Sequence, residues 1–550
     1  MKNDAALNEL LEDSNDNINA NSPETERKEY TQTRSHTTTR KKTCIGCISS
    51  FVSSVWFIIQ CILCHVLLLV FTLPILPFML LFFLLKTVER VIVTKTSDKI
   101  PLAPMDAVFL TDAGAEQMII NSVICFESKG TFEEGVQKLR DAIEERFVDA
   151  RKDFGVPLYP RVRCFIRPGY FQYFFEEDHS FAIDNHVFPW KGKIPSSKDE
   201  LEAIVSMLSN EPLPEGRSPW YCCCIPTNFG DNDFAVMFRV HHAMADGVSL
   251  IRFLIHQLPD NATIQRGLQN YSSTGRVLLL AKAALIAPRY LFKLQFKSSD
   301  NSILHGPELN WKRKITWNEP IDLKFIKEIK DATGTTVNDV LMSCMALALR
   351  RYFQRKGVEN PDDFTVALPV DVRAKATSQK LDLENRFSFI FPELPVATEG
   401  ALDQLYETKA RMDRAKISGE PLAAASVFSL SGKVNPQFLN AKTNSTLSRK
   451  LSGVLSNVRG PQEMLSVRGV RIKYLVFWPP QKENLGVTLS ILTYTGKVFV
   501  GVQGDTAVLS DPEVLLEEFG KAVNELTKCI PHTSGCVNEE PESLWHESSV

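Results

Sequence analysis

The chain has 550 residues, a net charge of -3 and a hydrophobic fraction of 44%, all ordinary for a globular protein. These values exclude a fibrous repeat and a chain that is disordered throughout. There is no basic excess, so we expect no nucleic-acid partner. Twelve cysteines are far fewer than a disulfide scaffold of this length would carry, and we expect no structural disulfides.

Residues 1–42 form a polar tail rich in Asn, Asp, Glu, Ser and Thr. Such a segment cannot bury enough apolar surface to offset the entropy lost on ordering, so it is predicted to be disordered. No signal peptide is expected, because the first apolar run begins too late in the chain. The tail ends in the basic residues Arg40, Lys41 and Lys42.

Residues 43–86 are predicted to enter a membrane. The stretch from Thr43 to Leu85 contains no Asp, Glu, Lys or Arg, and a spanning helix needs only about 20 apolar residues. Pro74 and Pro77 interrupt the run late, which leaves two topologies: a single span with an apolar interfacial extension, or a hairpin. Basic residues on both flanks favour the hairpin, because positive flanks stay on the cytosolic side.

Two CxxC pairs, Cys44 with Cys47 and Cys61 with Cys64, lie inside this apolar stretch. Their spacing alone is compatible with a zinc site. The apolar setting offers a thiolate cage no polar support, so membrane-embedded or acylatable thiols are favoured and no metal is expected.

The rest of the chain is predicted to be an α/β body in two halves, residues 87–258 and 316–530, followed by a tail at 531–550. Apolar periodicity predicts helices at 132–147, 200–208, 248–258 and 336–354, and strands at 161–166, 233–242 and 364–368, with a hairpin over 486–502. The linker, 259–315, contains a basic apolar helix at 276–297. This helix either lies on a membrane surface or packs between the halves.

The segment His241–Gly247, with the pattern HHxxxDG, ends the strand at 233–242. Side chains alternate along a strand, so Val240 and His242 share one face and His241 points to the other. The two histidines are therefore not expected to share a metal. His242 stands at the strand end, where its imidazole can reach a cleft.

A neutral imidazole at such a position can abstract a proton from a hydroxyl group. Asp246 is too constrained by the turn to be assumed a triad partner; it is expected to hold the loop by pairing with a distant Arg, and Gly247 to permit a tight turn. The alternative is that both histidines are core residues and that Asp246 caps the following helix.

Several further segments occur in a characteristic order: 101–110, Pro219–Trp220, 336–340, 368–373, 385–388 and 456–461. With HHxxxDG they resemble the bifunctional wax ester synthase/diacylglycerol acyltransferase family over roughly residues 100–530. That family belongs to the coenzyme A-dependent acyltransferases. The resemblance implies an α/β (α+β) chloramphenicol acetyltransferase-like fold, with two halves and a central tunnel.

The resemblance also implies a mechanism. Acyl-coenzyme A would enter the tunnel as a substrate, with no other cofactor, and a lipid alcohol would enter from the opposite face. His242 would act as general base for attack of the alcohol on the thioester. Asn338 is the candidate polar partner for the tetrahedral intermediate or for fixing His242, and its alternative role is a helix cap. Asp246 would support the motif by pairing with Arg373, together with His241.

The expected products are a wax ester from a long-chain alcohol or triacylglycerol from diacylglycerol. A competing hypothesis is a catalytically inactive, membrane-tethered protein that binds acyl-coenzyme A or lipid; the intact motif favours the enzyme. Another acyltransferase of the same fold is disfavoured by the membrane segment. We expect the endoplasmic reticulum membrane with a cytosolic catalytic body, or lipid droplets if the hairpin forms.

Overall fold

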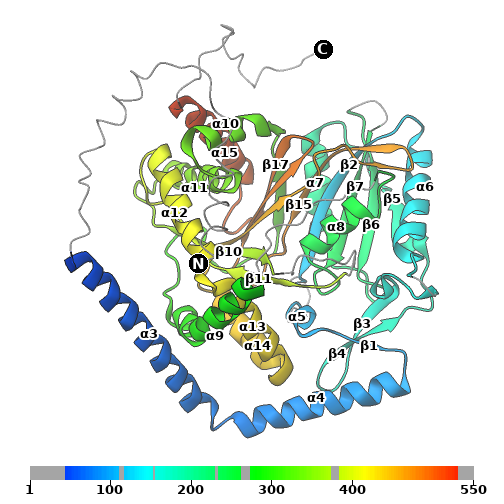
Figure 1. Cartoon of the computed structure of the whole chain (residues 1–550). Coiled ribbons are helices and arrows are strands. Elements are labelled where there is room, and N and C mark those ends of the chain that lie inside the picture. The colour runs from blue at the N-terminus through cyan, green and yellow to red at the C-terminus, as the bar shows by residue number, and fades with distance from the viewer. Residues whose placement is uncertain are drawn as a thin grey trace, which may run out of the picture. The chain divides into compact units, whose positions relative to one another are not determined.

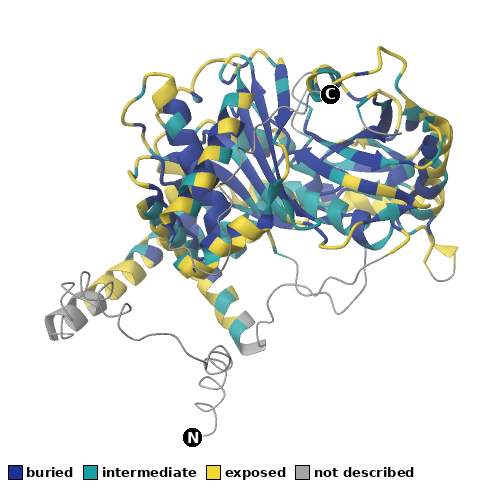
Figure 2. Ribbon diagram, turned by 90° about the horizontal axis from the view of Figure 1, so that it is seen from above, coloured by how far each residue is buried: buried dark blue, intermediate teal, exposed yellow. Residues whose placement is uncertain are grey.

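A computed structural model describes residues 44–110, 117–152, 155–229, 233–261, 273–372 and 383–530. The chain divides into two units, residues 1–62 and 63–550, which are described separately. Figure 2 shows that the strands of the second unit are largely buried, whereas its helices expose their outer faces.

The apolar segment forms two helices rather than one. Helix α3 is Cys44–Thr72, and its residues Val52–Thr72 are long and apolar enough to cross a membrane, with a mean hydropathy of 2.4. Helix α4 is Leu76–Thr96, with Pro77 in its first turn, where a missing N–H costs nothing. It therefore continues ten residues beyond the predicted end of the segment at 86.

One mixed sheet has six strands. Their order is β14 (Ser466–Val467), β15 (Val470–Trp478), β2 (Ile119–Glu127), β7 (Asp233–His241), β6 (Trp220–Pro226) and β5 (Val187–Pro189). Helices α6 (Phe132–Ile143), which continues as a π-helical turn at Glu144–Val148, and α8 (Gly247–His256) pack on one face, and α7 (Lys198–Ser209) on the other. The predicted alternation along β7 is confirmed. Val236 and Val240 belong to the core on the face covered by α6 and α8, and Ala235 and Met237 belong to the core on the face covered by α7.

The second large sheet has eight strands. The main path is β11 (Phe387–Ile390), β10 (Phe364–Asp371), β13 (Gly453–Arg459), β16 (Val487–Tyr494), β17 (Lys497–Asp505) and β8 (Arg313–Trp317); β12 (Glu393–Leu394) pairs with β10, and β9 (Ile321–Asp322) with β17. Its core is closed by α10 (Leu323–Thr333), α11 (Val337–Arg355), α12 (Ala401–Ser418) and α15 (Pro512–Cys529). The predicted hairpin turns at Thr495 and Gly496, both with positive φ.

The C-terminal part of the chain also contributes to the six-stranded sheet. Strand β15 comes from the C-terminal part of the sequence but pairs with β2, so Trp478 lies opposite Asn121. Trp478 also contacts Trp317 of the other sheet, with ring centroids 5.7 Å apart. The linear division into halves around 259–315 did not anticipate this crossing.

Smaller elements surround the sheets (Figure 1). A three-stranded sheet has the order β1 (Ile100–Pro101), β4 (Tyr173–Glu177) and β3 (Cys164–Pro168), with α5 (Pro104–Ala107) nearby and 3-10 turns at Pro160–Arg163 and Ile183–Asn185. The strand predicted at 161–166 therefore begins three residues late, because Pro160 starts a 3-10 turn.

The predicted basic helix of the linker is α9 (Ser273–Phe296). It buries Ala283, Ile286 and Tyr290, and it packs against α13 (Glu420–Val434), which is followed by α14 (Gln437–Ser448). The central part of this helix therefore packs against the protein, which is the second of the two alternatives predicted for it.

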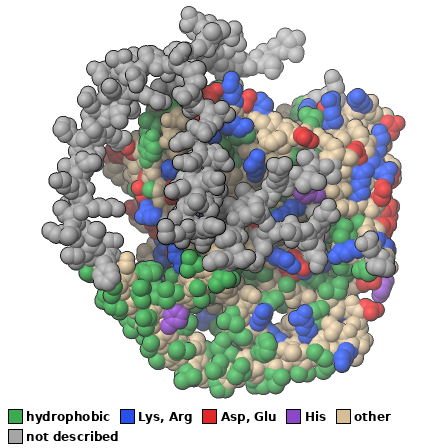
Figure 3. All heavy atoms as spheres, viewed as in Figure 1, with side chains coloured by type: hydrophobic (Ala, Val, Ile, Leu, Met, Phe, Trp, Pro, Cys, Tyr) green, Lys and Arg blue, Asp and Glu red, His purple; other side chains and the backbone are tan. Residues whose placement is uncertain are grey.

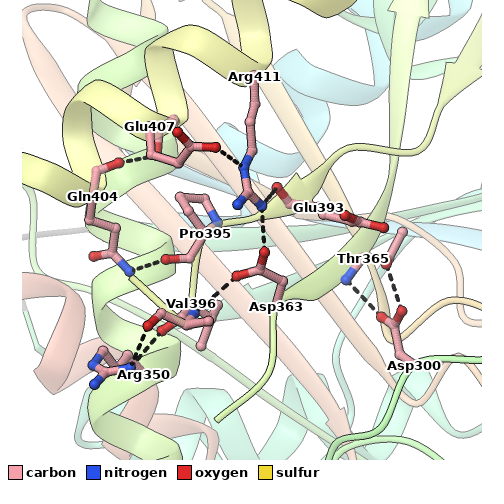
Figure 4. Close-up of polar contacts among 12 residues, drawn as sticks. Asp300, Arg350, Asp363, Thr365, Glu393, Pro395, Val396, Gln404, Glu407 and Arg411 are labelled. Atoms are coloured by element: carbon pink, nitrogen blue, oxygen red, sulfur yellow. Dashed lines mark hydrogen bonds and ion pairs between the residues drawn. The ribbon is translucent and has the colours of Figure 1, made fainter. Parts of the chain in front are cut away.

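A polar network joins the residue before β10 and the loop after β12 to helices α12 and α11 (Figure 4). On α12, Arg411 pairs with the carboxylate of Asp363 at 2.7 Å. On α11, Arg350 donates to the carbonyl of Val396 at 3.0 Å. These bonds fix the start of β10, and the neighbouring strand β11 carries part of the candidate site.

Candidate active site

His242 follows the last residue of β7, and its backbone N–H donates to the carbonyl of Met118 at 2.7 Å. Its side chain is 9% exposed. The imidazole stacks on Phe109 with ring centroids 3.9 Å apart, and Phe387 of β11 lies 5.6 Å away. Two aromatic rings thus restrict water around the imidazole and leave little freedom for the ring to rotate.

Asn385 determines which nitrogen of His242 carries the proton. The Asn385 side-chain NH2 donates to Asp106 Oδ1 at 2.9 Å and to the His242 carbonyl at 2.8 Å. Both partners only accept, so this end of the amide must be nitrogen, and Oδ1 must face His242 Nδ1, 3.0 Å away. Nδ1 therefore bears the hydrogen, and Nε2 is left with a lone pair.

Asp106 anchors this relay. It is fully buried, and its carboxylate accepts from the N–H of Ala103 at 3.3 Å, from both nitrogens of Asn385, and from Arg161 in an ion pair of 2.8 Å. Burial raises the pKa of Asp106, and Arg161 opposes that rise. Four donors around a single carboxyl group match its ionised, acceptor-only form.

The environment keeps His242 neutral. Burial lowers the pKa of His242 to about 4, and the negative charge of Asp246 only partly opposes this shift. A neutral imidazole with a free Nε2 lone pair is available to accept a proton near neutral pH, but its lowered pKa makes it a weaker base, so the imidazolium must be stabilised as it forms.

Asp246 caps α8. Its Oδ1 accepts from the N–H of Ser249 at 2.7 Å, and its Oδ2 accepts from the N–H of Arg386 at 2.9 Å. The capping alternative for Asp246 is thus confirmed, and the second bond also ties the motif to the segment that carries Asn385. Arg373 lies outside the described residues, so its pairing with Asp246 stays a prediction.

The remaining motif residues differ from expectation in one respect. Gly247 is the first residue of α8 and is not among the glycines with positive φ, so no tight turn requires it. An added Cβ there would meet no atom within 4 Å. His241 points to the other face of β7, where Nδ1 accepts from the N–H of Ala243 at 3.2 Å.

Asn338 is not the partner of His242 in this structure. The cap of α11 is Thr336, whose hydroxyl accepts from the N–H of Asp339 at 3.2 Å, so the capping alternative for Asn338 is wrong. Asn338 Oδ1 instead accepts from the amide of Asn457 on β13 at 2.9 Å. The contact that orients His242 comes from Asn385.

An apolar pocket lies on the same face of β7 as His242. Val236 and Phe238 line it from the strand, and Gly247 lines it from the start of α8. It encloses about 880 Å³, its open mouth included, and Ser122 supplies the only hydroxyl among the lining side chains. The apolar lining suits an alkyl chain.

Sequence reasoning gave no individual role to Asp106, Phe109, Asn385 or Phe387, although all four lie in segments that carried the family resemblance. The available signal was a polar residue close in sequence to a large apolar one: Asp106 lies three residues before Phe109, and Asn385 two residues before Phe387, and all four are buried. In the described part of the chain, no group of three or more His, Cys, Asp or Glu side chains could hold a metal. The side chains of Cys44 and Cys47 lie outside that part.

Comparisons with known proteins identify the family. Residues 102–278 match the model of the wax ester synthase/diacylglycerol acyltransferase catalytic domain, and residues 383–527 match that of the WS/DGAT C-terminal domain. Wax ester synthase/diacylglycerol acyltransferase 10 of Arabidopsis thaliana is 25% identical over 64% of this chain and 82% of its own. A Mycobacterium tuberculosis protein named "Probable diacylglycerol O-acyltransferase" is 25% identical over 64% and 80%.

Among solved structures that share the fold is a wax ester synthase/diacylglycerol acyltransferase from Marinobacter aquaeolei VT8. It is 20% identical and superposes with a TM-score of 0.55 over 78% of this chain and 99% of the bacterial one.

Replacing Asn385 with Ala is expected to lower kcat by about 100-fold or more, because His242 loses the acceptor that keeps the proton on Nδ1. KM for both substrates should change little. Initial rates of acyl transfer at saturating substrate measure the effect, with Asn301→Ala, a surface amide bonded to Asp362, as the matched control. A variant with wild-type kcat would contradict the proposed orientation.

The pH dependence should reflect the lowered pKa of His242. The neutral form is active, so kcat should stay level on acidification and fall only near pH 4, rather than near the ordinary 6.5. The unfolded chain binds this proton more readily than the folded chain, so stability should decline between pH 6.5 and 4. A pH–rate profile and melting temperatures over the same range measure both; an acid limb near 6.5 would refute the burial argument.

Proposed function

Because the chain belongs to the wax ester synthase/diacylglycerol acyltransferase family, we propose that it transfers a long-chain acyl group from acyl-coenzyme A to a lipid alcohol. The observation that carries the proposal is the buried, neutral His242, whose Nε2 lone pair is set by Asn385 and whose strand face continues into an apolar pocket.

His242 acts as general base. Its Nε2 takes the proton of the acceptor hydroxyl while the oxygen attacks the thioester carbonyl carbon, forming a tetrahedral intermediate. When the carbon–sulfur bond breaks, Nε2 returns the proton to the departing thiolate. The imidazolium that exists between these steps is stabilised by Asn385 Oδ1 and, one bond further away, by the charge of Asp106.

Asn338 is our candidate donor to the oxyanion. The amide of Asn457 donates to its Oδ1, which directs the Asn338 NH2 group away from Asn457. A side-chain amide oriented in this way can stabilise a developing negative charge. Asp246, and Arg373 as its proposed partner, hold the motif loop against the segment that carries Asn385.

The apolar pocket takes the acyl chain. Phe238 lies four residues before His242 on the same strand face, which places it roughly 13 Å deeper. The lining of the pocket is predominantly apolar, as an alkyl chain requires, and a diacylglycerol would bring two such chains. The acyl donor has a single chain with every acceptor, so the pocket fits the donor best.

Helix α3 is proposed as a membrane span, because residues Val52–Thr72 have the required length and hydropathy. Family membership names no compartment, since the matched relatives come from organisms as different as Mycobacterium tuberculosis and Arabidopsis thaliana. The endoplasmic reticulum therefore remains our proposal for a eukaryotic setting only. In the described part of the site nothing supports an inactive binding protein, because His242, Asn385 and Asp106 are all in place.

Membranes carrying the wild type should convert palmitoyl-coenzyme A to wax ester or triacylglycerol when hexadecanol and dioleoylglycerol compete as acceptors. His242→Ala should abolish both products, and the exposed His179→Ala should retain them. The product ratio identifies the preferred acceptor. Equal activity in the wild type and His242→Ala would overturn the mechanism, and no product from the wild type would overturn the proposed substrates.

Gly247→Leu should shorten the preferred acyl chain, because Gly247 lines the pocket and a Cβ there meets open space, so the new side chain would occupy room that the chain otherwise fills. Rates with acyl-coenzyme A from 10 to 18 carbons measure the shift, and Gly247→Ala is the smaller control. A shortened alcohol preference with an unchanged acyl preference would assign the pocket to the acceptor instead.

A further inference from the structure

Helix α4 meets the catalytic body through charged side chains. The stripe of α4 residues that faces the body is Met79, Phe82, Lys86, Glu89 and Val93, at helical spacings of three and four. Lys86 and Glu89 are only 9% and 8% exposed. The centre of the contact is therefore polar, the reverse of an ordinary surface helix.

These two buried charges are fully engaged. Lys86 Nζ donates to the carbonyls of Gly432 at 3.0 Å and Asn435 at 2.6 Å, at the end of α13. The Glu89 carboxylate accepts from the backbone N–H groups of Tyr170 at 2.5 Å and Phe171 at 3.0 Å, in the loop between β3 and β4. Bonds of this kind fix α4 to the body in one orientation, because breaking either would leave a buried charge unpaired.

The outward face of α4 is apolar. Eight large side chains on it are each 46–56% exposed: Phe78, Leu80, Leu81, Phe83, Leu84, Val88, Val91 and Ile92. The hydroxyl of Thr87, also exposed, donates back to the carbonyl of Phe83 at 2.7 Å. A hydroxyl satisfied within its own helix needs no water, as hydrocarbon surroundings require.

Neighbouring elements extend this surface. Tyr170, beside Glu89, is 94% exposed, Leu430 of α13 is 60% exposed, and Phe438 of α14 is 70% exposed. Hydrophobic side chains crowd the lower edge of the molecule in Figure 3, where α4 and α14 lie in Figure 1. The basic residues Arg90 and Lys95 follow toward the end of α4, where they can reach lipid phosphates.

We infer that the outward face of α4 is embedded in one leaflet of a lipid bilayer and holds the catalytic body against that leaflet. Lipid is the occupant because α4 follows α3 after a turn of three residues, so its first turn must begin at the boundary of any bilayer that α3 crosses. The inference rests on the proposed span of α3, not on the proposed chemistry.

A topology follows. If α4 were the returning arm of a hairpin, Lys86 and Glu89 would lie in hydrocarbon and could not bind Asn435 and Tyr170 of the body. Helix α3 therefore crosses the bilayer once. The hairpin favoured by the flanking charges gives way to the single span with an interfacial extension.

The test uses full-length protein in vesicles of dioleoylphosphatidylcholine and dioleoylphosphatidylserine, 4:1, with and without brominated phosphatidylcholine. Leu84→Trp places a fluorescent tryptophan on the outward face. Phe325→Trp is the matched control. Phe325 is 37% exposed and belongs to α10, which lies at the opposite edge of the body in Figure 1. Bromolipid should quench at least half of the emission added at Leu84 and little of that added at Phe325.

Two results would overturn the inference. Quenching of the Leu84→Trp emission by aqueous iodide, as at Phe325, would place the face in water. Protection from both quenchers would place a second protein copy or another protein on it. Neither measurement requires turnover, so failure of the proposed chemistry would leave this test intact.

The kinetic counterpart is the double variant Leu84→Glu/Val88→Glu. It should raise the apparent KM for dioleoylglycerol in these vesicles about tenfold or more and leave kcat with a water-soluble medium-chain alcohol unchanged. Phe325→Glu should alter neither value. An unchanged KM in the double variant would contradict embedding, whereas an inactive wild type with both acceptors would count against the proposed function alone.

Discussion

The hydrogen bond from His242 Nδ1 to Asn385 Oδ1 is the constraint on which the site depends. Its direction is set because Asp106 and the His242 carbonyl both accept from the nitrogen end of the same amide, which leaves Oδ1 to face Nδ1. Arg161 completes the chain of contacts. Residues far apart in sequence meet at this point, and the chain must bring β11 beside the end of β7 before any chemistry is possible.

The wider surroundings of the imidazole support the same proton transfer. Phe109 and Phe387 restrict water, and burial keeps His242 neutral. The apolar pocket on the same strand face can receive a chain that water would not dissolve. A catalytic body held on a leaflet by α4 would meet substrates and release products in the phase where both partition, which joins the membrane contact to the buried site.

Local patterns predicted much of this structure. The faces of β7, the position of His242 at a strand end and the main helices follow from side-chain periodicity, which needs only neighbouring residues. Asn385, Asp106 and the crossing strand β15 could not be derived in that way, because their partners lie hundreds of residues away. Composition alone also cannot tell that Lys86, read from the sequence as part of a basic flank, faces protein rather than water.

The most direct measurement of the relay is a double-mutant cycle on kcat with Asp106→Asn, Asn385→Ala and the combined variant, each normalised to folded protein. If Asp106 acts on His242 through Asn385, then removing Asn385 already disconnects it. The double variant should be no slower than Asn385→Ala alone. Rate losses that multiply in the double variant would show that the two residues act independently, and would contradict the account.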